Sequence, residues 1–488
     1  MKVFHQDRAR KQRIAIGVLA TSMLAGVLGF APAAQAQPNW IEVDCSESDF
    51  VAAVTEANTT TRNIIVLDDK CKYEFERPVA GTANALPVVT DTLTIYGNKS
   101  KVEADGDWFF RFMETAEDVS VTIRDLTIED FELAIPAVEV ATEPAGGAIL
   151  AHGPLTLRNS TVKDNEVFVL NVGPAGGLNL MGGGGVAGLD ASVTLTSSTV
   201  SGNDVTLVNI LNGVGGANIA AAGGVGIDGT GDDAPNTLRI DGSTVKGNKV
   251  SATGLYSLGW AAAGGAAAVD GAVMDMDGSS VSSNSVSAKS NVNINFAGVD
   301  ATLAEAGGVY LGSGTHDIDG STIDSNKASA KGGTIALGGG LVNIGTLTMD
   351  GGSISKNKAS CDDVCLALGG GYANTSIIAN GGVLLPVGPV GTAVFTGVTF
   401  TKNVADGDDG VGLGGGLLLA GDGGPAETRL VNSTITKNEA KGDVSRGGGI
   451  FAQDLDAVDV DDSVISKNKP DNCYALFTGP FWCNILDD

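Results

Sequence analysis

Aspartates recur at matching positions in the middle of the chain, and their type and spacing suit metal binding. Asp275 and Asp277 are followed by Asp317 and Asp319, with the same spacing inside each pair. Residues two apart on a strand point to the same side, so each pair would present two carboxylates together. Carboxylate oxygens are calcium ligands, which makes these four aspartates a candidate metal site and calcium the candidate cofactor. The alternative is a solvated acidic strip, because most runs of surface charge are simply solvated.

Two residues close to these aspartates are candidates for a catalytic base. Arg239 lies two residues before Asp241, which occupies the position of Asp277 one repeat earlier. His316 directly precedes Asp317, so alternation along a strand would turn its side chain inward. A histidine at the edge of a core is the favoured interpretation of His316. The sequence therefore assigns no catalytic residue.

A repeat must position these side chains. Glycine pairs recur nine times, at 146–147, 184–185, 223–224, 264–265, 307–308, 339–340, 370–371, 415–416 and 448–449. Each pair is followed by an asparagine, and the nine are Asn165, Asn203, Asn248, Asn284, Asn326, Asn357, Asn403, Asn438 and Asn468. Their mean spacing is about 38 residues, within the range of solenoid units. None of the pairs precedes the lysine and helix that a phosphate-binding loop needs.

Apolar residues occupy fixed places before each asparagine. The residue three before it is Val162, Val200, Val245, Val281, Ile323, Ile354, Phe400, Ile435 or Ile465. The residue eight before it is Leu157, Leu195, Ile240, Met276, Ile318, Met349, Phe395, Leu430 or Val460. Short alternating segments of this kind predict strands with one buried face. Repeated at like places, they predict an all-β parallel solenoid whose coils stack and hydrogen-bond to one another.

The asparagines and glycines are expected to form the corners of each coil. Asparagine tolerates the left-handed conformation, and stacked asparagines can hydrogen-bond along a solenoid. The glycine pairs would supply positive φ and close backbone approach at a second corner. Seventy glycines in 488 residues then need no low-complexity explanation.

Two groups of segments resemble a known repeat family. Gly146-Gly147-Ala148-Ile149 and Phe400-Thr401-Lys402-Asn403 are similar to the GGAI and FxxN tetrapeptides of polymorphic outer-membrane protein repeats. Residues 93–98 and 121–128 resemble the opening coils of pectate-lyase-like β-helices. The resemblance covers about residues 60–470 and implies a right-handed parallel β-helix. It also implies two possible chemistries: lyases of that fold use calcium and a basic group, and hydrolases use close aspartates.

The two ends of the chain differ from the repeat. Basic residues followed by an apolar run from Ile14 to Phe30 and by Ala34-Gln35-Ala36 predict a signal peptide over residues 1–36. We expect an N-terminal cap over 37–80, with an amphipathic helix at 48–58 whose N-cap is Ser48. The solenoid would span 81–469. Residues 470–488 would form a C-terminal cap that covers the exposed strand edges of the last coil.

Six cysteines fall into three local pairs. These are Cys45 with Cys71, Cys361 with Cys365, and Cys473 with Cys483. Fifteen connectivities are open in principle. An exported chain meets an oxidising compartment, so three local disulfides are favoured over a zinc site.

The charge balance restricts the partners. The formal net charge is −27, and removing residues 1–36 would leave 25 basic and 56 acidic residues, a net of −31. Such a surface repels nucleic acid and anionic lipid. We therefore expect an exported monomer, extracellular, on the cell surface or periplasmic, with a binding, adhesive or structural role and a neutral carbohydrate or cell-surface protein as partner. The alternative function is that of a polysaccharide lyase or glycoside hydrolase.

Overall fold

A computed structural model describes most of the chain after Pro38. The described residues are 39–136, 145–171, 179–209, 219–229, 235–254, 260–261, 263–290, 303–332, 335–362, 365–375, 378–380, 383–385, 390–420, 428–454, 457–476 and 479–480. Residues 39–488 make up one compact unit. The predicted signal peptide lies outside the described residues.

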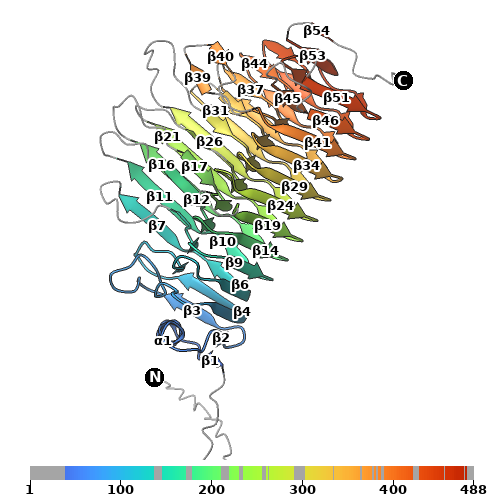
Figure 1. The fold of residues 1–488 in the computed structure, drawn as a ribbon. Coiled ribbons are helices and arrows are strands. Elements are labelled where there is room, and N and C mark those ends of the chain that lie inside the picture. The colour runs from blue at the N-terminus through green and yellow to red at the C-terminus, as the bar shows by residue number, and fades with distance from the viewer. Residues whose placement is uncertain are drawn as a thin grey trace, which may run out of the picture. The chain divides into compact units, whose positions relative to one another are not determined.

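The unit is a right-handed parallel β-helix. The repeat predicts the stack of parallel strands, and the family resemblance implies the right-handed sense. One coil contains β23 (Ala266–Ala268), β24 (Val273–Asp277), β25 (Ser280–Ser282), β26 (Ser285–Ser290) and β27 (Leu303–Glu305), and β28 (Val309–Leu311) begins the next. β24 and β25 belong to a 23-stranded sheet, β26 to a nine-stranded sheet, β27 to an eight-stranded sheet, and β23 and β28 to a twelve-stranded sheet. Strands of successive coils pair in parallel and in register (Figure 1).

The coils on either side of this one repeat its plan. The preceding coil contains β19 (Thr237–Asp241), β20 (Thr244–Lys246), β21 (Lys249–Gly254) and β22 (Trp260–Ala261). The following coils contain β29 (Thr315–Asp319), β30 (Thr322–Asp324), β31 (Lys327–Lys331), β32 (Ile335–Leu337), β33 (Leu341–Asn343), β34 (Thr346–Asp350), β35 (Ser353–Ser355) and β36 (Lys358–Cys361).

The main core lies between the 23-stranded and twelve-stranded sheets. The predicted inward series are confirmed: Val200, Val245, Val281 and Ile323 are fully buried and stack coil upon coil. In the second series every member is buried except Val460, which is half-buried. Valine, isoleucine, leucine, methionine and alanine fill most of this narrow interior, which is consistent with the low aromatic content.

A second, smaller core was not predicted. Valines and alanines of the nine-stranded sheet pack with alanines of the eight-stranded sheet, for example Val286 and Ala288 on β26 with Ala304 on β27. We call these two sheets the wing. The buried residues between these two sheets, which we call the wing core, form a separate apolar cluster from the main core. A third buried cluster includes Ala267, Leu303 and Tyr310, from the twelve-stranded and eight-stranded sheets.

The asparagines form a continuous hydrogen-bonded ladder. The side-chain Nδ2 of Asn248 donates to Oδ1 of Asn284 at 3.0 Å, and Asn284 donates in the same way to Asn326 at 3.0 Å. The same bond links all nine asparagines and ends on Asn472. Each Nδ2 also donates to a backbone carbonyl of the preceding coil, such as that of Val245 for Asn284. The predicted stacking of the asparagines is therefore confirmed.

The predicted left-handed conformation of these asparagines is wrong. The positive φ values lie one residue earlier, at Asp164, Gly202, Gly247, Ser283, Ser325, Lys356, Lys402, Lys437 and Lys467. The asparagine side chain must point inward to bond its neighbours, so the preceding residue makes the turn. Within the glycine pairs only Gly146 has a positive φ, so the predicted positive φ is wrong for the other members. The predicted close approach of the backbone is confirmed, because an added Cβ would collide with neighbouring atoms.

Helix α1 (Glu47–Ala57) covers the first coil, beside β1 (Trp40–Val43), β2 (Ile64–Leu67) and β3 (Lys72–Phe75) (Figure 1). It begins one residue after Ser46, so the predicted N-cap at Ser48 is wrong. The ring of Phe50 on α1 lies 5.5 Å from that of Tyr73 and 6.2 Å from that of Phe75. The helix thus closes the end of the core with aromatic contacts.

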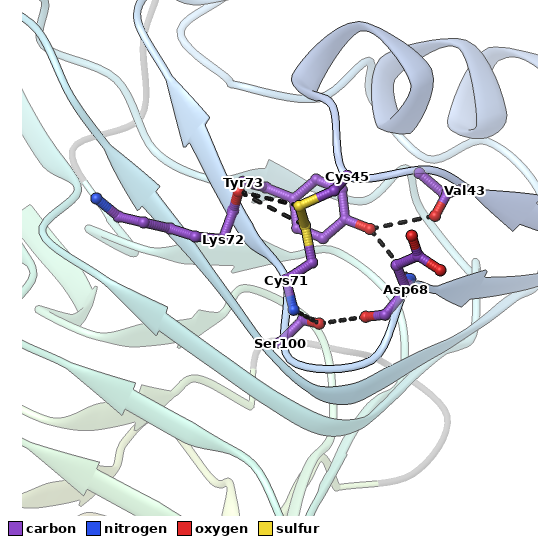
Figure 2. Close-up of a disulfide and its surroundings, with 7 residues drawn as sticks. All are labelled: Val43, Cys45, Asp68, Cys71, Lys72, Tyr73 and Ser100. Atoms are coloured by element: carbon purple, nitrogen blue, oxygen red, sulfur yellow. Dashed lines mark hydrogen bonds between the residues drawn. A yellow bond between two sulfur atoms is a disulfide. The ribbon is translucent and has the colours of Figure 1, made fainter. Parts of the chain in front are cut away.

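The structure contains the disulfides Cys45–Cys71 and Cys361–Cys365. The first holds the segment before α1 to β3, beside the Ser100 hydroxyl, which accepts a hydrogen bond from the Cys71 N–H (Figure 2). The second joins the two sheets of the wing within one coil. Cys483 lies outside the described residues, and so does its predicted pairing with Cys473. At the C-terminal end, β53 (Cys473–Ala475) pairs antiparallel with β54 (Gly479–Pro480) and ends the parallel stack.

None of the helices that the structure describes combines the length and the apolar character needed to cross a bilayer.

Candidate functional site

The predicted aspartates share one outward face. Asp275 pairs in register with Asp317, and Asp277 with Asp319, on β24 and β29. The neighbouring strands β19 and β34 add two more carboxylates to the second column. We call the resulting set the aspartate strip; it consists of Asp241, Asp275, Asp277, Asp317, Asp319 and Asp350. All six side chains are exposed or half-exposed.

Arg239 already neutralises part of the aspartate strip. Its guanidinium forms an ion pair with Asp275, one coil along. Among the described residues, the one group of three carboxylates whose ligand atoms lie within 4.8 Å of one another is elsewhere, at Glu103, Glu129 and Asp130. Calcium binding at the aspartate strip therefore stays a prediction that requires the side chains to move together.

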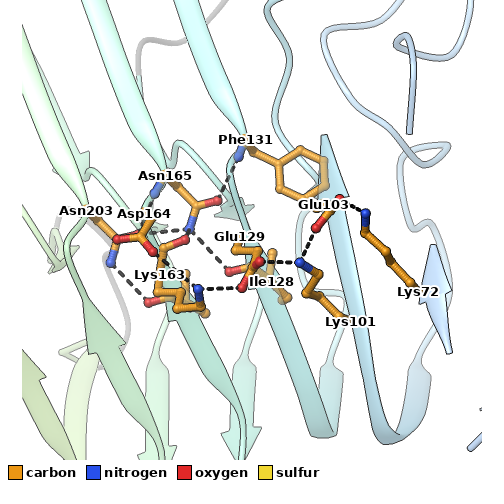
Figure 3. A network of polar contacts seen from close by, with 11 residues as sticks. Lys72, Lys101, Glu103, Ile128, Glu129, Phe131, Lys163, Asp164, Asn165 and Asn203 are labelled. Atoms are coloured by element: carbon orange, nitrogen blue, oxygen red, sulfur yellow. Dashed lines mark hydrogen bonds and ion pairs between the residues drawn. The ribbon is translucent and has the colours of Figure 1, made fainter. Parts of the chain in front are cut away.

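Glu103 and Glu129 belong to a charge ladder on the first coils. They lie on β4 (Leu93–Ala104) and β6 (Val121–Glu129), in register, and both are buried. Lys101 reaches both carboxylates, and Lys163 lies 2.6 Å from Glu129 (Figure 3). Lys72 pairs with Glu103 from the other side. Ammonium groups thus surround these carboxylates, and the charge ladder ties together four strands that are neighbours in the 23-stranded sheet.

The lysines set the charge state of these carboxyls. Burial raises the pKa of Glu129, but hydrogen bonds from Lys101 and Lys163 outweigh it and hold the pKa below its ordinary value. The same balance lowers the pKa of Glu103. Asp130, next to Glu129, behaves differently, because burial and then the Glu129 charge raise its pKa. The lysines and the two glutamates of the charge ladder are therefore ionised at neutral pH, and the charge ladder has a structural role.

An open, shallow surface cavity of about 410 Å³ lies on the first coils. Its lining residues are Val88, Glu114, Thr115, Ala116, Glu117 and His152. The Glu114 carboxylate accepts a hydrogen bond from Nδ2 of the buried Asn84 at 3.0 Å and lies 3.6 Å from the buried Arg111 guanidinium. Two carboxylates and an imidazole around one cavity are groups that can act as acid and base.

Sequence reasoning missed this cavity. Glu114 precedes the first glycine pair, so alignment on the nine repeats leaves it out. The available signal was that Glu114 and His152 stand about one repeat period apart. β5 (Met113–Glu114) pairs with β8 (Ile149–Ala151), and this pairing brings the two side chains to one face.

His316 is a core residue, as the sequence favours. It is fully buried; its Nδ1 accepts the Met274 N–H at 3.1 Å, and its Nε2 lies 3.0 Å from the Gly312 carbonyl oxygen. That pattern fixes the neutral tautomer protonated at Nε2. Burial lowers the pKa of His316. It therefore serves packing and backbone satisfaction rather than catalysis.

Comparisons with known proteins do not identify the chain. No family model matches it, and no curated protein matches it. Among solved structures, the A-module of the mannuronan C-5 epimerase AlgE6 of Azotobacter vinelandii is similar at 12% sequence identity and a TM-score of 0.34, over 89% of this chain and 92% of that module. A similarity at this level carries no inference about activity or ligand.

Proposed function

We propose that the protein is an exported β-helix with a binding, adhesive or structural role, and that its partner is a neutral carbohydrate or a cell-surface protein. The observation that carries this proposal is a column of hydroxyl groups along one outward face. In register, one coil after another, stand Thr161, Thr199, Thr244, Ser280, Thr322, Ser353, Thr399 and Thr434. All are half-exposed.

This hydroxyl column suits a partner that itself repeats. Its members are spaced by the strand separation of ~4.8 Å, and each offers both a donor and an acceptor without charge. A neutral polysaccharide presents hydroxyls that can pair with them at regular intervals. The acidity of the rest of the protein does not oppose such a ligand.

Retention on immobilised glycans tests the hydroxyl column. Thr244→Val together with Thr322→Val keeps the side-chain shape and removes two hydroxyls, each worth about 0.5–1.5 kcal/mol as a hydrogen bond. We expect retention on a neutral polysaccharide to fall by about fivefold or more. The matched control is Thr206→Val with Thr253→Val, two half-exposed threonines on the nine-stranded sheet. Equal retention by both double variants would refute the assignment.

The cavity at Glu114 favours a second candidate function, that of an enzyme acting on a polysaccharide. Asn84 and Arg111 hold the Glu114 carboxylate in place, while Glu117 and His152 line the same space. Release of reducing or unsaturated ends from a glycan, abolished by Glu114→Gln and unchanged by Glu439→Gln, would establish this function. A lack of turnover on substrates that the protein retains would leave the binding role.

A further inference from the structure

Lysines gather on the outer face of the wing. In the nine-stranded sheet, β21, β26, β31 and β36 alternate between residues of the wing core and outward residues. The outward positions of these four strands include five lysines, which we call the lysine patch: Lys249, Lys289, Lys327, Lys331 and Lys358. All are exposed or half-exposed.

This concentration contrasts with the protein as a whole, which has 30 basic and 57 acidic residues. Acidic neighbours stand at the two ends of the lysine patch, where Asp204 lies 3.9 Å from Lys249 and Asp406 lies 2.7 Å from Lys358. Within the described parts of the chain, no ion pair engages the three middle lysines, Lys289, Lys327 and Lys331. Their positive charge faces solvent.

The lysine patch and the aspartate strip occupy the same four coils. The aspartates lie on β19, β24, β29 and β34, and the lysines lie on β21, β26, β31 and β36, two strands further along each coil. Both sets therefore have the same pitch and the same extent along the stack. They lie on different sheets, so one copy presents the two surfaces in different directions.

We propose that the lysine patch docks against the aspartate strip of a second copy of this chain. Because both are built on one coil repeat, two stacks lying side by side with their coils level bring the opposite charges together coil for coil. The contact uses different surfaces on the two copies, so a pair keeps a free aspartate strip on one copy and a free lysine patch on the other, and the assembly can continue. The proposal revises the expectation of a monomer and goes beyond carbohydrate binding.

The overall acidity does not prevent such a contact at physiological salt. The Debye length there is about 8 Å, so charges at the contact interact while most of the distant like charges are screened. Salt well above this level would also screen the contact itself. Association of this kind must therefore weaken as salt is raised.

Charge reversal tests the proposal, with EDTA present so that no divalent cation can bridge two acidic strips. One variant carries Lys289→Glu with Lys331→Glu, and another carries Asp277→Lys with Asp319→Lys. Sedimentation velocity of the purified protein over a range of concentrations should show self-association of the wild type, at least tenfold weaker in about 1 M NaCl. Each variant alone should be at least tenfold weaker in association, and an equimolar mixture of the two should regain it.

The mixture is the decisive sample, because it restores opposite charges at every contact. The control, Lys246→Glu with Lys467→Glu, removes two exposed lysines outside the lysine patch and should associate as the wild type does. A monomeric wild type, or a mixture that stays monomeric, would overturn the proposal. So would association that is lost with the lysine variant but kept by the aspartate variant, since the patch would then bind some other acidic partner.

Discussion

Gly265 and the side chain of Asn284 lie in close contact at the neck, by which we mean the narrow part of a coil between the main core and the wing core. A Cβ atom added to Gly265 would lie 2.8 Å from Nδ2 of Asn284, and one added to Gly264 would lie 2.6 Å from the Ser285 nitrogen. Gly265 lies where the chain leaves the wing, just before β23, and Asn284 lies where it enters the wing again, just before β26. These two segments meet at the neck. The same approach recurs at Gly308 with Asn326 and in later coils.

The neck predicts that the glycine pairs are intolerant of any side chain. Gly265→Ala should lower the free energy of unfolding by about 3 kcal/mol, because the added methyl overpacks a contact with the asparagine ladder. Gly320→Ala is the control: this glycine has a φ of +53° and open space around it. It should cost about 1 kcal/mol, from backbone strain alone. Denaturant unfolding measures both free energies of unfolding. A larger decrease for Gly320→Ala than for Gly265→Ala would contradict the proposed importance of close packing at the neck.

Because of the asparagine ladder, we predict that replacing a ladder asparagine by aspartate lowers the free energy of unfolding strongly, although the two side chains have nearly the same size. In Asn284→Asp the side chain loses the amide that donates to Asn326 and to the Val245 carbonyl. One carboxylate oxygen would keep the two Asn248 donors, but the other would face only acceptors, the Asn326 Oδ1 and the Val245 carbonyl, in a buried site. We therefore expect the free energy of unfolding to fall by at least about 3 kcal/mol at neutral pH. The loss should shrink as pH falls and the carboxyl protonates. A pH-independent loss would mean that the donor to Asn326 is not important.

Two glutamates should respond to pH in opposite ways. The pKa of Glu129 is lowered, so its contribution is present above the ordinary value of 4.5 and is lost as pH falls through the lower folded-state pKa. Glu129→Gln should therefore cost about 2 kcal/mol at pH 7 and little at low pH. The pKa of Glu132 is raised, by burial and then by the charge of Glu166.

Glu132→Gln should therefore raise the melting temperature at pH 7, since it removes a carboxylate that is less stable in the folded state. As pH falls through the raised pKa toward 4.5, Glu132 protonates and the advantage should disappear. Thermal melts of both variants from low to neutral pH provide the measurement. Shifts of the same sign for the two variants would contradict the assigned charge states.

Calcium binding at the aspartate strip predicts a stabilisation that depends on two residues. Calcium should raise the melting temperature of the wild type and release or absorb heat on titration, and Asp277→Asn with Asp319→Asn should abolish both effects. Asp459→Asn with Asp461→Asn is the control: these aspartates occupy the same two columns in a later coil, where Arg429 already pairs with both, so the calcium effects should remain. If the wild type shows neither heat nor stabilisation, the aspartate strip is a solvated surface.

Alignment of the repeats on Asn165 and its eight successors predicts the coil period, the inward series and the ladder. The wing was not predicted, because its core consists mainly of alanine and valine in segments joined by inserts of unequal length, which hide the repeat. The turn residues were misassigned by one position, since sequence preference does not distinguish an asparagine that turns from one that bonds. The lysine patch was hidden by the net charge, which averages over faces that the fold separates.

The most direct test of the proposed function measures retention and cleavage on a panel of neutral and acidic polysaccharides, with and without calcium. We predict that the purified protein is retained on a neutral polysaccharide, that Thr244→Val with Thr322→Val weakens this retention, and that no reducing or unsaturated ends are released. Release of such ends, lost in Glu114→Gln or in Asp277→Asn, would contradict this prediction and make the protein an enzyme.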